Sequence, residues 1–163
     1  MTSPVLYGLP PIIDRGAHTL ILGNMPSVMS LTSQQYYGNP RNAFWRIMGG
    51  IAGFAEDDAY AERVSALTDR GLAVWDVLHS CRRIGSLDSA VEPDSMVPND
   101  FEVLFERHPG ITRVLFNGAA AQKNFRRLVT LTRNLEYRRL PSTSPAQTMP
   151  YADKSAAWRE ALS

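Results

Sequence analysis

Ten consecutive residues near the start of the chain combine aromatic rings with amide side chains. They read Tyr36-Tyr37-Gly38-Asn39-Pro40-Arg41-Asn42-Ala43-Phe44-Trp45. An aromatic ring can stack on a planar heterocycle while a neighbouring amide hydrogen-bonds to its edge, which is how many proteins hold an unpaired nucleobase. The alternative is a tight turn followed by a helix-capping asparagine, with the last two rings in the core. We favour the core for Phe44 and Trp45, and both interpretations stay open here for Tyr37 and Asn42.

Other polar or glycine residues directly follow short apolar runs. Gly23 ends one run, and a glycine at this point allows the backbone to turn close to a ligand. Asn117 and Gly118 end another run, where backbone N–H groups at a helix start could face a phosphate, or where the glycine only permits the turn. The segment 142–144 carries three hydroxyl groups between two prolines, and such groups can contact phosphates.

Four apolar runs predict buried strands, because three of them are nearly continuous rather than alternating. The runs cover residues 18–23, 72–77, 112–117 and, more weakly, 136–140. Helical spacing of apolar residues predicts helices at 42–51, 58–68, 119–131 and 153–162, and a further helix that carries Phe101, Leu104 and Phe105 and ends before Pro109. Strands that alternate with helices predict a three-layer α/β sandwich, with a four-stranded, mostly parallel sheet flanked by helices. The carboxyl ends of parallel strands meet at one edge of a sheet, so the loops described above should meet there.

The composition limits the classes of protein to which the chain can belong. The chain has 163 residues, of which 44% are hydrophobic and 20% charged, and this predicts a single domain over residues 1–163. A single cysteine, Cys81, fits a reducing compartment, and we expect a cytoplasmic monomer. No apolar run reaches the length of a membrane span, and the three histidines are too far apart in sequence to predict a metal site. The net charge is +1, so any nucleic-acid binding must depend on the local arrangement of the arginines in the second half.

Four segments, each at or after the end of a predicted strand, carry a resemblance to a known family. They are Leu20-Ile21-Leu22-Gly23-Asn24-Met25-Pro26-Ser27, the aromatic segment 36–45, Trp75-Asp76-Val77 and Leu140-Pro141-Ser142-Thr143-Ser144-Pro145-Ala146. Together they resemble the uracil-DNA glycosylase superfamily, and in particular its hypoxanthine-DNA glycosylase branch, or family 6. The resemblance implies the sandwich fold predicted above and an enzyme that hydrolyses the N-glycosidic bond of a damaged base in DNA. It implies no metal and no organic cofactor.

The resemblance also implies that Asn42 is the catalytic residue, because it matches the functional asparagine that family 6 carries before its Phe-Trp pair. Other branches have a polar residue where this chain has Met25, and a methionine cannot activate water. Lys123 and Lys154 are the only lysines of the chain, and neither lies in the four loops. We therefore expect a monofunctional glycosylase, without a lyase step through a Schiff base.

Asp76 matches the position that reads the edge of the base in other branches. An ionised aspartate accepts hydrogen bonds but cannot donate them, so it would accept the N1–H of hypoxanthine and repel the bare N1 of adenine. Uracil also presents an N–H group, at N3, and Asp76 alone does not exclude it. Alternatively, Asp76 caps the turn that follows its strand. Leu140 replaces a polar residue of many relatives and so removes a donor to the leaving base, which counts against efficient uracil excision.

The predicted site has a base pocket and a set of DNA contacts. Besides the catalytic Asn42, the base pocket comprises Gly23, Asn24, Met25, Tyr37, Asn39 and Asp76. The DNA contacts comprise Ser27, Ser86, Asn117, Gly118, Ser142, Thr143 and Ser144. A base inside a duplex must be flipped into such a pocket before its glycosidic bond can be reached.

Deoxyinosine in DNA is the expected substrate, and uracil is the first alternative. A second alternative is a catalytically silent module that binds damaged DNA, because Met25 and Leu140 both replace polar residues of better-known relatives. A generic nucleotide-binding α/β domain is disfavoured, because the chain has neither a Gly-x-Gly-x-x-Gly loop nor a Gly-Lys-Ser/Thr loop. The fold alone would not separate these functions.

Overall fold

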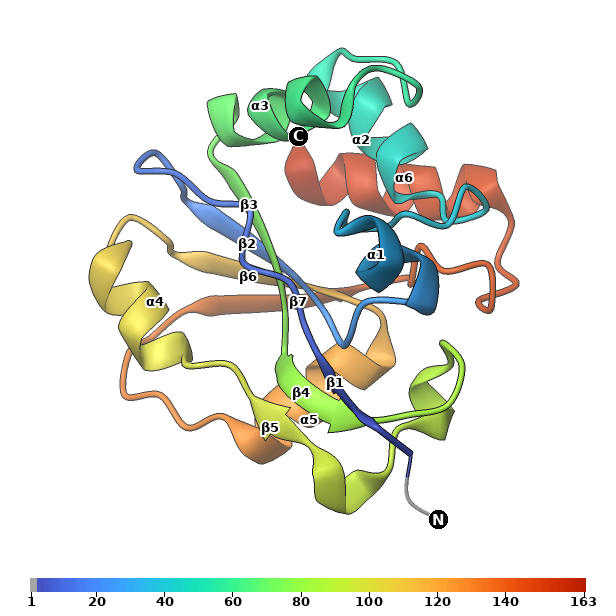
Figure 1. Cartoon of the computed structure of the whole chain (residues 1–163). Helices are drawn as coiled ribbons and strands as arrows, with labels where there is room; N and C mark the ends of the chain where they lie inside the picture. Colours follow the sequence, from blue (N-terminus) through green and yellow to red (C-terminus); the bar gives the residue numbers. More distant parts are fainter. Residues whose placement is uncertain (1–2) are drawn as a thin grey trace.

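A four-stranded sheet lies at the centre of the computed structural model, which describes residues 3–163 (Figure 1). Its strands, in spatial order, are β3 (Leu72–Asp76), β2 (Thr19–Gly23), β6 (Arg113–Asn117) and β7 (Glu136–Leu140). Every neighbouring pair of strands is parallel. All five residues of the inner strand β2 are buried, as its continuous apolar run predicts.

The carboxyl ends of the four strands lie at one edge of this sheet. Gly23 at the end of β2 pairs with Asp76 at the end of β3, and Asn117 at the end of β6 pairs with Leu140 at the end of β7. The four loops that the sequence singles out therefore leave the sheet side by side.

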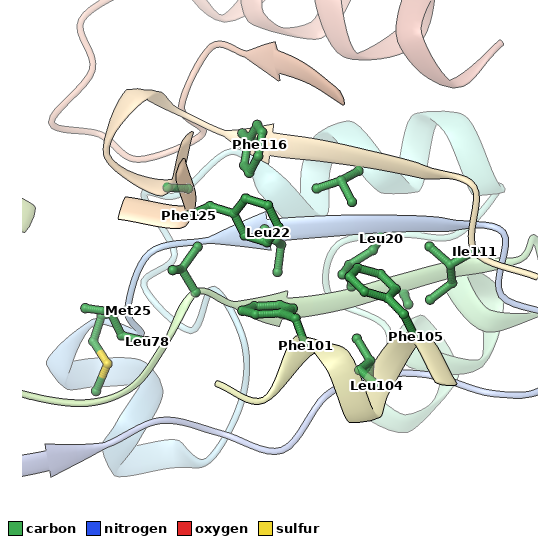
Figure 2. Packing of buried hydrophobic residues seen from close by; sticks show 14 of the residues in the cluster. Leu20, Leu22, Met25, Leu78, Phe101, Leu104, Phe105, Ile111, Phe116 and Phe125 are labelled. Atoms are coloured by element: carbon green, nitrogen blue, oxygen red, sulfur yellow. The ribbon is translucent and has the colours of Figure 1, made fainter. Parts of the chain in front are cut away.

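Helices cover both faces of the sheet (Figure 1). One layer contains α4 (Phe101–Arg107) and α5 (Ala119–Leu128), and the other contains α2 (Phe44–Ala52), α3 (Tyr60–Asp69) and α6 (Tyr151–Leu162). Alternate residues of β2 divide between two cores, since Leu20 and Leu22 pack on the side of α4 and α5 and Ile21 packs on the other side. Figure 2 shows Phe101 and Phe105 of α4 pointing toward β2. The predicted three-layer sandwich is confirmed.

A second, antiparallel sheet was not expected from the sequence pattern. Its strands are β1 (Val5–Tyr7), β4 (Leu78–Arg82) and β5 (Val97–Pro98), in the order β1-β4-β5. Because β4 begins two residues after β3 ends, the chain passes directly from one sheet into the other (Figure 1). Three short helices were also not expected, namely α1 (Val28–Ser33) and the 3-10 helices η1 (Asp88–Ala90) and η2 (Pro93–Ser95).

The predicted element bounds agree closely with the structure for the main sheet. Each strand differs from its prediction by at most one residue at either end. The helix predicted at 119–131 ends at Leu128, because Val129 adopts an extended backbone. Within residues 3–163, no helix is long and apolar enough to cross a membrane, and no group of metal-binding side chains comes together.

Candidate functional site

A cavity of about 220 Å³ opens at the carboxyl edge of the main sheet. Every residue predicted for the site, except Gly118, lies on its wall. These wall residues are Gly23, Asn24, Met25, Ser27, Tyr37, Asn39, Asn42, Asp76, Ser86, Asn117, Ser142, Thr143 and Ser144. Gly118 lies next to Ser142 instead, with a backbone φ of 97° that favours glycine. Loops from four strands thus meet at one cavity, as the parallel topology requires.

The paired ends of β2 and β3 bring Gly23 close to two polar side chains. A Cβ atom on Gly23 would lie 2.5 Å from Oδ1 of Asp76 and 3.1 Å from the hydroxyl oxygen of Tyr37. The glycine therefore allows a carboxyl group and a phenol to lie against the same piece of backbone. No other residue type fits this point without a shift of its neighbours.

Replacing Gly23 by alanine is expected to lower the free energy of unfolding by about 1–3 kcal/mol, because the added methyl group overpacks a filled region. Asp76 is buried and the ring of Tyr37 is stacked on Phe44, so neither neighbour moves away freely. Chemical denaturation of the two proteins measures the difference. The matched control is Gly16→Ala, whose Cβ would lie 3.6 Å from its nearest neighbour. Equal losses in both variants would contradict the predicted crowding.

Asp76 is a buried carboxyl group that the protein leaves without a hydrogen-bond donor at one oxygen. It is 4% exposed, and its Oδ2 has no partner among residues 3–163. Burial, together with the nearby charge of Asp88 and against the effect of Arg83, raises the pKa of Asp76 to about 7. Its backbone carbonyl accepts from Nδ2 of Asn99 at 2.8 Å, whereas its side chain makes no hydrogen bond among residues 3–163 and so does not cap the following turn. The carboxyl group can therefore accept from a ligand and, when protonated, also donate.

Tyr37 is fixed at both its ring and its hydroxyl group. The ring stacks on Phe44 with 4.0 Å between the ring centroids, and the hydroxyl oxygen accepts a 3.1 Å hydrogen bond from Nδ2 of Asn117. The backbone φ of Tyr37 is 53°, a left-handed value that is uncommon for a tyrosine and marks a constrained position. Phe44 and Trp45 are buried, which confirms the prediction that they belong to the core.

Asn117 joins the loops that follow β6 and β7. Its Nδ2 also donates to Oγ1 of Thr143 at 3.0 Å, and the backbone N–H of Thr143 donates back to Oδ1 of Asn117 at 2.9 Å. Thr143 is 1% exposed, and its carbonyl accepts from the N–H of Ala43 at 3.0 Å. The sequence predicts DNA contacts for Asn117 and Thr143, whereas their observed bonds hold three loops around the cavity.

Asn42 has features of both interpretations given above, a residue at the start of a helix and a residue that contacts a ligand. Its Oδ1 accepts the N–H of Phe44, the first residue of α2, at 2.9 Å, and so satisfies a backbone donor at the start of this helix, although Ala43 occupies the N-cap position. Its Nδ2 has no partner within the described part of the chain, and the residue lies on the cavity wall. The carbonyl end of the amide thus holds the side chain in place while the N–H groups stay available to a ligand.

Ser27 and Ser86, which were predicted to contact DNA, both cap a short helix at the rim of the cavity. Oγ of Ser27 accepts from the N–H of Ser30 at 3.1 Å, and Oγ of Ser86 accepts from the N–H of Val28 at 2.9 Å. Both bonds fix the first turn of α1. Contacts of these two serines with DNA stay a prediction.

Asn24 uses both ends of its amide within the protein. Its Nδ2 donates to Oδ1 of Asp88 at 3.1 Å, and its Oδ1 accepts from Nδ2 of Asn124 at 2.8 Å. Asp88 and Asn124 were not expected as its partners, because they lie 64 and 100 residues away in the sequence. Met25 belongs to the core on the side of α5, and Figure 2 shows it at the end of this core near Leu78.

Two buried cations near the cavity were also missed by sequence reasoning. Nη2 of Arg83 donates to the carbonyl of Pro26 at 2.7 Å, while its Nε and Nη1 are buried without a partner in residues 3–163. Lys154 of α6 is 4% exposed, and its ammonium group donates to the carbonyls of Ser144 at 3.0 Å and Gln147 at 2.7 Å. A lysine therefore reaches a site loop, although none lies within the loops themselves.

Comparison with known proteins gives a consistent result. The family model of the Uracil DNA glycosylase superfamily matches residues 10–163. A protein of Methanosarcina barkeri named hypoxanthine DNA glycosylase is 32% identical over 156 residues, which are 95% of this chain and 96% of that protein. Its namesake from Methanosarcina acetivorans is 35% identical over 154 residues, 93% of this chain and 94% of that protein. The solution NMR structure of a candidate uracil DNA glycosylase from Methanosarcina acetivorans superimposes with a TM-score of 0.80 at 32% identity, over 98% of this chain and 97% of that one.

Proposed function

Since the chain belongs to the uracil DNA glycosylase superfamily, we propose that it excises a deaminated base from DNA, with hypoxanthine as the preferred base. The names of the two Methanosarcina relatives support this choice of base. The reaction is hydrolysis of the N-glycosidic bond, and its products are the free base and an abasic site. The substrate is DNA that carries the damaged nucleotide.

The observation that carries the choice of a deaminated base over adenine is the buried carboxyl group of Asp76 on the cavity wall, whose Oδ2 has no partner among residues 3–163. Hypoxanthine presents N1–H beside its O6 carbonyl. Ionised Asp76 accepts the N1–H, and protonated Asp76 accepts it at one oxygen while its O–H donates to O6. Either arrangement supplies a partner to a buried oxygen that otherwise has none, and buried polar atoms rarely stay without one.

Asn42 and Tyr37 supply the other functions that base release needs. Breaking the glycosidic bond builds negative charge on the leaving base and positive charge on the sugar. The free N–H groups of Asn42 can donate to the leaving base or hold the attacking water, whereas a neutral amide cannot act as a general base. Tyr37 provides an aromatic wall whose position is set by Phe44 and Asn117.

We infer that no lyase step follows base release. Lys154, whose ammonium group reaches a site loop, donates to two backbone carbonyls and is almost fully buried. A Schiff base would require this amine to lose both bonds, to lose its proton and to approach the sugar. Through these two hydrogen bonds, Lys154 instead connects α6 to the loop that follows β7.

The proposal is tested with labelled oligonucleotides that carry deoxyinosine, deoxyuridine or deoxyxanthosine at one position. We expect alkali-labile sites with deoxyinosine and much slower release from deoxyuridine, because the buried Leu140 offers no donor to uracil. The undamaged oligonucleotide and a reaction without enzyme are the controls. Release of uracil alone would contradict the preference for hypoxanthine, and tight binding without release of any base would identify a silent recognition module.

A further inference from the structure

A second hollow of the surface, a shallow groove beside α5, is lined by four basic side chains. Lys123, Arg126 and Arg127 of α5 lie on it together with Arg139 of β7, and no acidic residue lines it. The whole chain carries 17 basic and 16 acidic residues, so this groove concentrates positive charge that is balanced elsewhere. Such a local concentration attracts an extended anion even when the net charge is near zero.

The spacing of these side chains explains why they share one face. Lys123 and the pair at 126 and 127 are three and four residues apart on α5, which places them next to each other on the helix surface. Arg139 lies on the same face of β7 as Tyr137, whose ring stacks on Phe116 beneath α5. Arg138 faces the other way and pairs with Glu160 at 3.3 Å. The edge strand and the helix therefore present one continuous basic surface.

The four cations have no protein partner that would explain their positions. All four are exposed, and within residues 3–163 none of them makes a salt bridge or a side-chain hydrogen bond. In contrast, the side chain of Arg133 donates to three backbone carbonyls. The basic groove is thus free to bind a ligand without breaking internal contacts.

The basic groove begins beside the base cavity. Gly118, the residue before α5, lies next to Ser142 of the cavity wall, and Arg139 directly precedes Leu140 at the end of β7. The ten residues of α5 span about 15 Å along the helix axis. This length corresponds to about four phosphates of one DNA strand, at about 3.4 Å of duplex axis for each.

We propose that the basic groove binds the phosphodiester backbone of the damaged strand on one side of the flipped nucleotide. This inference rests on the proposed function, because that function makes DNA the ligand of the adjoining cavity. A base in the cavity fixes its own phosphates at the rim, and the strand must leave the rim in two directions. The groove supplies a basic path for one of them, so the footprint on the damaged strand is asymmetric.

The first test measures binding to an undamaged duplex, which needs no excision activity. The variant K123Q/R126Q/R127Q removes three charges from the basic groove, and the control R15Q/R70Q/R107Q removes three exposed charges from loops and a helix end at the opposite edge of the sheet. We expect the groove variant to bind about 100-fold more weakly at about 0.2 M salt. The slope of log affinity against log salt should flatten by about 2.7, that is 0.9 for each lost phosphate contact. An unchanged slope, or equal changes in the groove and control variants, would overturn the proposal.

The second test shortens the DNA on one side of a deoxyinosine at a time and measures the excision rate constant and KM. Shortening to two nucleotides should raise KM about tenfold on one side only, with kcat retained, and the groove variant should lose this dependence. Equal dependence on both sides in the wild type would contradict the one-sided path. If no base is excised at all but the salt slope still flattens, the proposed function fails while the groove stands.

Discussion

Replacing Asn42 by alanine is expected to lower the rate constant of base release about 10²–10³-fold, the usual loss when one positioned donor to a developing negative charge is removed. The structure leaves the N–H groups of Asn42 without a partner in residues 3–163, while its carbonyl oxygen is held by the N–H of Phe44. Met25 occupies the position in the first loop at which other branches have a polar residue, and it is part of the core. The measurement is single-turnover release of hypoxanthine under saturating enzyme.

Loss of the hydrogen bond from Phe44 must be separated from loss of the donor. Removal of a side-chain acceptor at the start of a helix costs about 1 kcal/mol of stability, which leaves the protein folded but shifts its denaturation midpoint. Asn42→Asp keeps an oxygen for the N–H of Phe44 and removes the amide donor. We expect this variant to be as stable as the wild type and as slow as the alanine variant. An aspartate variant that retains its rate would assign Asn42 to holding water, and an alanine variant with full activity would remove it from catalysis.

The main sheet could be predicted from the sequence because its strands are buried on both faces. A strand that is buried on both faces, such as the five-residue β2, is a nearly continuous run of apolar or small residues. Such a run can be recognised in the sequence without knowing which strands pair with it. The small sheet could not, since β1 has three residues and β4 mixes Leu78 with His79 and Arg82. Its strands form because the chain continues from β3 into β4, which pairs with β1 and β5. The sequence pattern of apolar and polar residues does not indicate that continuation.

The residues that line the cavity could be predicted from the sequence, but their hydrogen bonds could not. The position of Asn42 before the aromatic pair and of Asp76 at a strand end could be found from local sequence. The bond between Asn117 and Tyr37 joins residues 80 apart, and the bonds of Lys154 join α6 to a loop. Lys123 and the arginines that follow it on α5 do not line the base cavity. A DNA strand, however, continues beyond the base cavity, and the basic groove beside α5 suits its phosphodiester backbone.

Replacing Asp76 by asparagine is expected to weaken the discrimination between hypoxanthine and adenine rather than the binding of hypoxanthine itself. An asparagine accepts N1–H and donates to O6 of hypoxanthine, but its amide can also donate to the bare N1 of adenine. Forcing two acceptors together in a buried site costs about 1–3 kcal/mol, so the affinity ratio at pH 8 should fall about 10- to 100-fold in the variant. Dissociation constants for single strands with non-cleavable 2′-fluoro deoxyinosine or 2′-fluoro deoxyadenosine measure this ratio.

The pKa of Asp76 adds a test within the wild-type protein. Because burial raises this pKa to about 7, the carboxyl group is mainly protonated at pH 6 and mainly ionised at pH 8. The protonated form donates to adenine N1, so wild-type discrimination should be weak at pH 6, strong at pH 8, and independent of pH in Asp76→Asn.

Stability changes with pH in the opposite direction. The folded state holds this proton more tightly than the unfolded chain, so the advantage of the wild type over Asp76→Asn in unfolding free energy is greatest below about pH 4 and is lost as the pH rises through 7. Denaturation curves of both proteins at several pH values measure this loss. If the stability difference follows this course while the affinity ratio stays constant from pH 6 to 8, Asp76 titrates as described but does not contact the edge of the base.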